Sequence, residues 1–158
     1  MDKISRLVWN PEYSMKMDLL DSQNRKLFGL INHHIDLYEI GSGDYFRVIR
    51  YLVDHLSNQF HKEHMSMMIA RYPGLLKHLR EHQIFTVKME EFLEDSLRGE
   101  KQLGHKMALF LTAWAADHVA VLDAHFGEYL LNHPEKREEI KKHNNDFEKQ
   151  PFLYVVNG

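Results

Sequence analysis

The residues of this chain best suited to chemistry are histidines and carboxylates on three consecutive predicted helices. His78 and His82 are four residues apart, and residues at this offset lie on one face of a helix, close enough to bind one metal ion. The predicted helix before them carries Glu63, and the one after them carries His118 and Asp123. Metal sites in the core of helical bundles are built from such ligands on facing helices. The pattern therefore predicts a metal site with nitrogen and oxygen ligands.

Two features of this ligand set are weakly specific. A histidine pair at an offset of four also arises by chance in a chain with twelve histidines, as two surface residues. The five-residue step from His118 to Asp123 turns an ideal helix by about 140°, too far for an obvious chelating pair. Spacing alone does not select these two residues.

Four amphipathic helices are predicted to position the ligands, because apolar residues recur at three- and four-residue steps in four stretches. Gly41 and Gly43 break the first stretch from the second, for which Asp44 is a predicted N-cap, while Pro73 and Pro134 bound the later ones. Short connections predict an all-α fold, an antiparallel up-down four-helix bundle. The predicted helices cover about residues 19–38, 45–71, 74–98 and 102–133.

The chain is predicted to form one bundle with two extensions. Residues 1–133 make up the metal-binding bundle, and residues 1–18 within them form an ordered N-terminal arm over one face. Residues 134–158 form a C-terminal tail that is charged up to Lys149 and apolar from Phe152 to Val156. The apolar segment is a candidate docking segment, and the oligomeric state stays open.

Composition excludes several functions. The chain has no cysteine, so thiolate metal sites, disulfides and nucleophilic thiols are excluded. The net charge is −3 with basic residues scattered among acidic ones, which argues against nucleic acid as a partner. The sequence shows neither a secretion signal nor an apolar run long enough to span a bilayer. We therefore expect no membrane partner and a cytoplasmic location.

Further residues match at fixed spacings between about Trp9 and Leu131. They are Trp9; Asp21, Ser22 and Gln23, followed by Leu27, Phe28 and Asn32; Glu63 and Met67; Tyr72 and Pro73 before His78 and His82; and Trp114, His118 and Asp123. This series resembles the hemerythrin family, in particular its single-domain bacterial members. The resemblance implies a four-helix bundle that holds two non-heme irons and binds dioxygen reversibly. It also implies that His78, His82 and His118 bind one iron, with Glu63 and Asp123 as bridging carboxylates.

The chain departs from the family pattern at two positions. Asn24 and Gln59 stand where the family has histidine ligands, and both belong to the iron that receives dioxygen. Amide oxygens are weak donors compared with imidazole, so the second site is degenerate. Their amides are instead expected to hydrogen-bond a metal-bound water or the free carboxylate oxygens. One iron per chain is favoured, two are an alternative, and manganese or zinc would also suit these ligands.

The predicted function is a non-heme metal-binding protein that binds or senses dioxygen or another small diatomic ligand. Whether it is an enzyme is open, with a non-enzymatic role favoured. The first alternative is a mononuclear redox enzyme acting on superoxide or peroxide, since three histidines and a carboxylate leave an open position. The others are a di-iron oxygen-binding protein despite the substitutions and a structural module whose tail docks on itself or a partner.

The remaining histidines and apolar residues are predicted to have structural roles and not to bind metal. His55, His61 and His64 lie near Gln59 and Glu63 but point away on an ideal helix, so they are assigned polar or surface roles. Solvated or core-edge positions are expected for His33, His34, His105, His125, His133 and His143. Core positions are expected for Phe28, Phe60, Met67, Met68 and Trp114, and for a third-helix stripe that includes Leu76, Ile84 and Val87.

Overall fold

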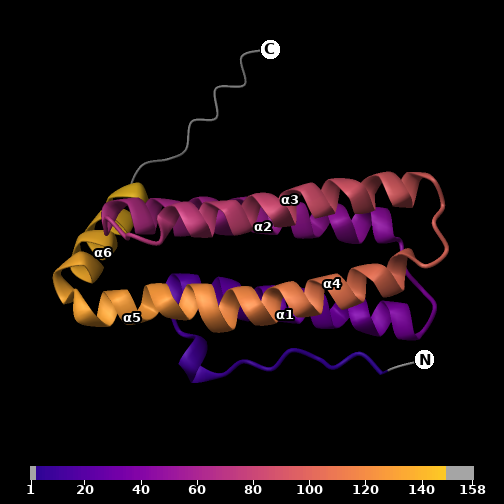
Figure 1. The fold of residues 1–158 in the computed structure, drawn as a ribbon, viewed down its shortest axis with the longest axis horizontal. Coiled ribbons are helices and arrows are strands. Elements are labelled where there is room, and N and C mark those ends of the chain that lie inside the picture. The colour runs from indigo at the N-terminus through magenta and orange to yellow at the C-terminus, as the bar shows by residue number, and fades with distance from the viewer. Residues whose placement is uncertain (1–2, 149–158) are drawn as a thin grey trace, which may run out of the picture.

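The computed structural model describes residues 3–148, and over these residues the chain is helical without strands. Four long helices run up and down as an antiparallel bundle (Figure 1), which confirms the predicted fold class. The fourth is a continuous helix of three segments, the middle one π-helical. The helices are α1 (Asp18–Glu39), α2 (Tyr45–Ile69), α3 (Leu75–Leu97) and the fourth, composed of α4 (Leu103–Asp117), η2 (His118–Asp123) and α5 (Ala124–Asn132).

Local sequence signals explain where the helices begin and end. Asp44 caps α2, its side chain accepting a hydrogen bond of 3.1 Å from the backbone N–H of Arg47. Gly41 and Gly99 follow α1 and α3 with φ of 66° and 73°, a left-handed conformation that glycine adopts without strain. Pro134 begins the next helix, as expected for a residue without a backbone N–H.

The core consists of two apolar clusters separated by a polar layer. In the bundle α2 packs mainly on α3, and α1 on α4. Along α2, Phe60 belongs to the larger cluster and Met67 to the smaller one, with the buried carboxylate Glu63 between them. The same change from apolar to polar and back occurs along the other three helices. A cross-section of the bundle is therefore polar although it is buried.

The N-terminal arm lies over the bundle, as predicted, and is held by specific contacts. The backbone of Leu7 exchanges two hydrogen bonds with the Asn32 side chain, at 2.8 and 2.9 Å. Further along, a short 3-10 turn, η1 (Pro11–Tyr13), leads to Met15, whose N–H donates to Asp21. The arm passes so close to α5 that a Cβ atom at Gly127 would clash with the Ser14 carbonyl oxygen.

The first part of the C-terminal tail is a helix, α6 (Pro134–Glu148), which packs against α2 and α5. Ile140 on this helix is fully buried in the smaller apolar cluster. The candidate docking segment from Phe152 to Val156 lies outside the described residues.

Two predictions about the core were wrong. On α3, Leu76, Ile84 and Val87 of the predicted stripe are 75%, 51% and 48% exposed. His82 and Phe92 of that stripe are buried, and the buried face passes through Phe85 between them. Met68 on α2 is 58% exposed, whereas the other apolar residues expected in the core lie there: Phe28, Phe60, Met67 and Trp114.

The expectation that no apolar run is long enough to span a bilayer was wrong: one helix in the described part of the chain, Leu103–Asn132, is long and apolar enough by length and composition. Of its most apolar window, 44% is buried inside the bundle. Since a core helix passes the same test, this is weak evidence for a membrane span.

Candidate metal centre

Seven side chains from all four long helices form the polar layer. Each side chain is at most 3% exposed, whereas polar and ionisable side chains mostly lie at the protein surface. They fall into two halves around a pair of carboxylates. The carboxylates are Glu63 and Asp123; the imidazole half consists of His78, His82 and His118; and the amide half consists of Asn24 and Gln59.

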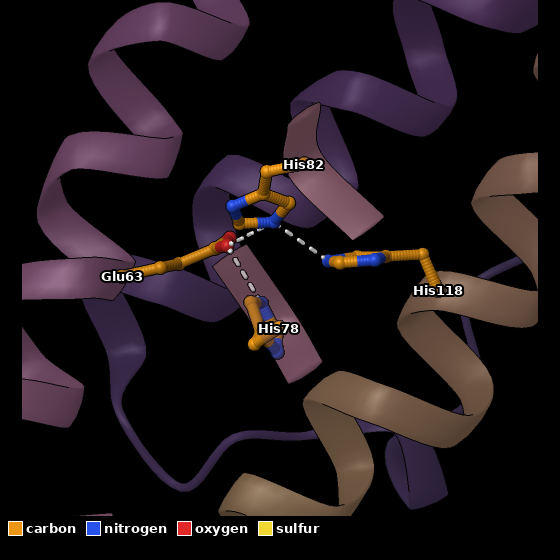
Figure 2. Close-up of side chains that lie close together, drawn as sticks. All are labelled: Glu63, His78, His82 and His118. Carbon is orange, nitrogen blue, oxygen red and sulfur yellow. Dashed lines mark hydrogen bonds and ion pairs between the residues drawn. The ribbon is translucent and has the colours of Figure 1, made fainter. Parts of the chain in front are cut away.

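The imidazole half converges on one point. Figure 2 shows the three rings directed toward one another and toward the Glu63 carboxylate. Oε2 of Glu63 lies 3.1 Å from Nε2 of His82 and 3.3 Å from Nε2 of His78, while Nε2 of His82 lies 2.9 Å from Nε2 of His118. One donor atom from each of these four residues falls within 4.8 Å of the others. The structure thus brings four of the five predicted ligands into one cluster.

Asp123 faces the same point from the fourth helix. Its Oδ1 lies 3.3 Å from Nε2 of His78 and 3.3 Å from Nε2 of His118. The predicted obstacle, the five-residue step from His118, does not apply because these residues form the π-helical segment η2. In a π-helix the hydrogen bonds join residues five apart, so side chains at this step share one face.

The amide half connects the two carboxylates on the other side. Nδ2 of Asn24 donates a 2.7 Å hydrogen bond to Oδ2 of Asp123. Nε2 of Gln59 donates to Oε1 of Glu63 at 2.8 Å and to Oδ1 of Asn24 at 2.6 Å. Each carboxylate thus has one oxygen toward the imidazoles and one oxygen occupied by an amide N–H. Of the two expected roles for these amides, they adopt hydrogen bonding to the free carboxylate oxygens.

The charges in the layer favour a cation. Burial raises the pKa of the Glu63 carboxyl, but hydrogen bonds from His78 and His82 outweigh burial, and the pKa lies below its ordinary value. Burial lowers the pKa of His82 to about 3, so this ring is neutral. Burial lowers the pKa of His118 as well, but the Asp123 charge outweighs it and raises that pKa. Burial and the Glu63 charge raise the pKa of Asp123. The ionised Glu63 beside a neutral His82 gives the layer negative charge that favours a cation.

These residues fit a metal ion. Two ligand atoms that each lie about 2.0–2.1 Å from one ion, at right angles to each other, are about 2.9 Å apart. The ring nitrogens and carboxylate oxygens of the site are separated by a similar 2.9–3.3 Å. Oδ1 of Asp123 is buried and makes no well-aligned hydrogen bond, although the Nε2 atoms of His78 and His118 lie 3.3 Å away. Such an orphaned acceptor is costly unless a cation or water satisfies it. The ligand roles of the five residues stay a prediction that this geometry supports.

Aromatic rings pack against two of the imidazoles. Phe60 stacks on His82 with ring centroids 3.6 Å apart, and Trp114 stacks on His118 at 4.6 Å. These rings lie between the polar layer and the larger apolar cluster. They limit the rotation of the imidazoles and exclude water from the layer.

One residue near the site has a contact that helical spacing did not reveal. His64, predicted to have a polar or surface role, is half-buried and its Nε2 lies 2.7 Å from Nδ1 of His82. Its four-residue offset from Phe60 places both residues on one face of α2, but spacing along α2 does not show which residue of α3 that face meets.

The other histidines have no ligand geometry in the described part of the chain. His34 was expected at the surface or core edge, but it is fully buried, its Nε2 lying 3.1 Å from the Gly104 carbonyl oxygen. His55 is half-buried one turn from Gln59, and His105 stacks on Tyr38. Exposed positions are occupied by His33, His61, His125 and His143.

Known proteins with similar sequences were found among the bacteriohemerythrins. No protein-family model matches the chain. Bacteriohemerythrin from Stenotrophomonas maltophilia is 25% identical over 128 residues, which cover 80% of this chain and 83% of the relative. Bacteriohemerythrins from Pseudomonas aeruginosa and Clostridium acetobutylicum are 26% and 24% identical, over 77% and 75% of this chain and 79% and 97% of the relatives.

The fold is also that of solved hemerythrin structures. A crystal structure of wild-type hemerythrin superposes with a TM-score of 0.70 at 19% identity, covering 80% of this chain and 98% of that one. A hemerythrin mutant gives a TM-score of 0.69 at 20% identity, over 78% and 96% of the two chains. The structural likeness shows the fold, and the sequence relatives support the family that the residue pattern resembles.

Proposed function

We propose that this chain, a hemerythrin-like four-helix bundle, binds one non-heme metal ion, with iron the expected metal. The ligands would be Glu63, His78, His82, His118 and Asp123. The observation that carries the proposal is the polarity of the groups around the two carboxylates. On one side the carboxylates face imidazole nitrogens, which can lose a proton and bind a cation through a lone pair; on the other side they face amide N–H groups, which have no lone pair to offer.

The amide half explains why one ion is proposed and not two. A second ion on the far side of the carboxylates would need Oε1 of Glu63 and Oδ2 of Asp123, but both oxygens already accept hydrogen bonds from amides. An N–H donor presents partial positive charge, which disfavours a cation at the same place. The amide oxygens are themselves weak ligands. A di-iron protein is therefore the less favoured alternative.

Charge balance also favours one divalent ion. Two carboxylates and one divalent cation sum to zero, and a neutral buried site is less costly than one with an uncompensated charge. Without a cation, His118 beside Asp123 holds its proton more readily than an ordinary histidine does, because the Asp123 charge outweighs burial and raises the pKa of His118. Binding would release that proton.

The enclosed site favours binding or sensing of a small diatomic ligand such as dioxygen or nitric oxide. Three imidazoles and two carboxylates supply five ligand atoms, which leaves one position on a six-coordinate ion. A bound redox-active metal would supply electron exchange with that ligand. All seven residues of the layer are almost fully buried, so the layer disfavours a large ligand.

A redox enzyme acting on superoxide or peroxide is the second candidate, and the same open position favours it. The two functions differ in stoichiometry. A binding protein gives one spectral change per metal ion with each gas or with peroxide, whereas an enzyme consumes substrate repeatedly.

The test of the proposal is metal content by elemental analysis after anaerobic reconstitution of the full chain with Fe²⁺, followed by optical titration with dioxygen, nitric oxide and peroxide. About one iron per chain is expected, and manganese and zinc are tested as competing metals. His125→Ala, at an exposed position beside Asp123, is the matched control and should retain the metal. Two irons per chain would favour the di-iron alternative, and no iron would contradict the proposal.

The proposal extends to the cellular location of the protein and to the role of its C-terminal tail. A cytoplasmic location is proposed because a chain without cysteine suits a reducing compartment, and the apolar segment from Phe152 to Val156 is proposed to dock on the chain or on a partner. Deleting residues 150–158 tests the tail. Unchanged oligomeric state, solubility and metal content would show that the tail has no part in assembly.

A further inference from the structure

His82 differs from the other two imidazoles because both of its nitrogens have side-chain partners. Its Nε2 lies 3.1 Å from Oε2 of Glu63, and its Nδ1 lies 2.7 Å from Nε2 of His64. The Nδ1 atoms of His78 and His118 are buried without a hydrogen-bond partner. Building on the proposed single metal ion, we propose that His64 is a positioning residue that holds Nε2 of His82 toward the metal.

Helix α2 contributes two neighbouring pairs of side chains at an offset of four, and each pair has a different task. Gln59 and Glu63 face the polar layer and are hydrogen-bonded to each other. Phe60 and His64, one position further along, face the His82 ring on α3. Phe60 stacks on the face of that ring with an interplanar angle of 10°, and His64 meets its Nδ1 edge. Together they restrain both rotation and tilt of the ring.

The protonation pattern follows from the chemistry of imidazole. A metal ion binds the lone pair of a ring nitrogen, so a neutral His82 bound through Nε2 carries its proton on Nδ1. That N–H would then donate to Nε2 of His64, 2.7 Å away, and His64 would carry its own proton on Nδ1. A partner on the non-ligating nitrogen fixes the tautomer and orientation of a ligand histidine and raises its basicity.

His64 acts through His82 and is not itself a ligand. It follows Glu63 directly in the chain, so its side chain projects about 100° away from Glu63 around the helix. Its Nε2 is adjacent to the outer nitrogen of His82, the one that faces away from Glu63 and His118. Because the side chain is only half-buried, its replacement does not empty a core position.

The test compares three variants of the full chain by competitive Zn²⁺ titration against a chromophoric chelator. His64→Phe keeps a ring but removes the acceptor, and we expect it to weaken zinc binding by about 10- to 100-fold. His64→Gln keeps an acceptor oxygen and should recover most of the affinity. His61→Phe makes the same substitution at an exposed position on α2 and should match the wild type.

A second measurement separates positioning from general destabilisation. In the zinc-loaded wild type, nitrogen-15 NMR should show His82 bound through Nε2 with a slowly exchanging Nδ1–H, and His64→Phe should accelerate that exchange. Circular dichroism and thermal unfolding of the metal-free variants establish that they fold, with His64→Ala as the replacement if His64→Phe does not.

The outcomes distinguish this inference from the proposed function. If wild type and His64→Phe bind zinc equally, or if affinity falls without a change at Nδ1 of His82, the role of His64 is overturned. If the wild type binds no metal ion, the proposed function fails, and the inference that rests on it fails too.

Discussion

The imidazole half and the amide half of the polar layer are alike in burial and position but opposite in chemistry. Both are almost fully buried, both come from helices of the same bundle, and both contact the same two carboxylates. The imidazoles direct ring nitrogens at the carboxylates around a common point, whereas Asn24 and Gln59 direct N–H groups at them. The comparison teaches that the kind of nitrogen, and not burial or backbone position, decides which side of a carboxylate pair is available to a cation: an imidazole nitrogen can lose its proton and become a ligand, whereas an amide N–H cannot.

The largest expected effect comes from breaking the imidazole half. His78 is the target because its Nε2 lies 3.3 Å from an oxygen of each carboxylate. His78→Ala removes a ligand and is expected to reduce iron content from about one per chain to almost none. Elemental analysis after reconstitution measures it, with His125→Ala as the control. Iron retained at one per chain would remove His78 from the ligand set.

The second effect is a gain of metal on converting the amide half into imidazoles. Asn24→His combined with Gln59→His removes the N–H donors from Oδ2 of Asp123 and Oε1 of Glu63 and supplies two nitrogen ligands. Iron content should rise from about one to about two per chain. Each single variant should stay near one, because it leaves one amide hydrogen bond in place. A double variant with one iron would mean that the backbone spacing, not the amides, limits the number of ions.

The four helices that carry both halves could be predicted from the sequence, because the residues that start and end a helix act locally. Asp44 as a cap, glycines at positive φ and proline at helix starts act within a few residues, and the four helices begin and end near the predicted positions. Asn24 and Gln59 could be recognised from the sequence because they stand at positions where the hemerythrin pattern has histidines. Recognising them required no knowledge of their contacts. Their hydrogen bonds span 99 and 35 residues in sequence, so the network itself required the fold.

What the sequence did not predict depends on helix geometry and packing. No proline or glycine lies between His118 and Asp123 to indicate the π-helical segment, so ideal spacing placed these side chains apart. On α3, periodicity alone did not separate Ile84, which is exposed, from its buried neighbour Phe85. The contact between His64 and His82 joins two helices, and helical spacing describes only one at a time.

The next effect is a pH dependence of metal binding that arises in the imidazole half. Asp123 raises the pKa of His118, so in the metal-free protein this imidazole keeps its proton to a higher pH than an ordinary histidine. The metal must displace that proton, so zinc affinity should fall as pH falls through the raised pKa, by about tenfold per pH unit for one proton. Zinc titrations across pH, and calorimetry in buffers of different ionisation enthalpy, measure the proton released.

The amide half provides the control for that prediction because Asn24 and Gln59 do not titrate. Gln59→Leu should shift the pH profile of zinc binding little. Affinity that does not vary with pH in the wild type would contradict the raised pKa of His118.

The smallest effect tests whether the amide half stabilises the layer without binding metal. Gln59→Leu removes the donor to Oε1 of Glu63 and to Oδ1 of Asn24, leaving two buried acceptors unpaired. We expect the free energy of unfolding to fall by about 1–3 kcal/mol, measured by urea denaturation of the metal-free protein. Gln83→Leu, on the exposed side of α3, is the matched control. Iron content should stay at one per chain, because leucine frees a carboxylate oxygen but supplies no ligand. A stable variant would mean that the amides fill space without orienting the carboxylates, and the contrast between the two halves would then be one of ligand type alone.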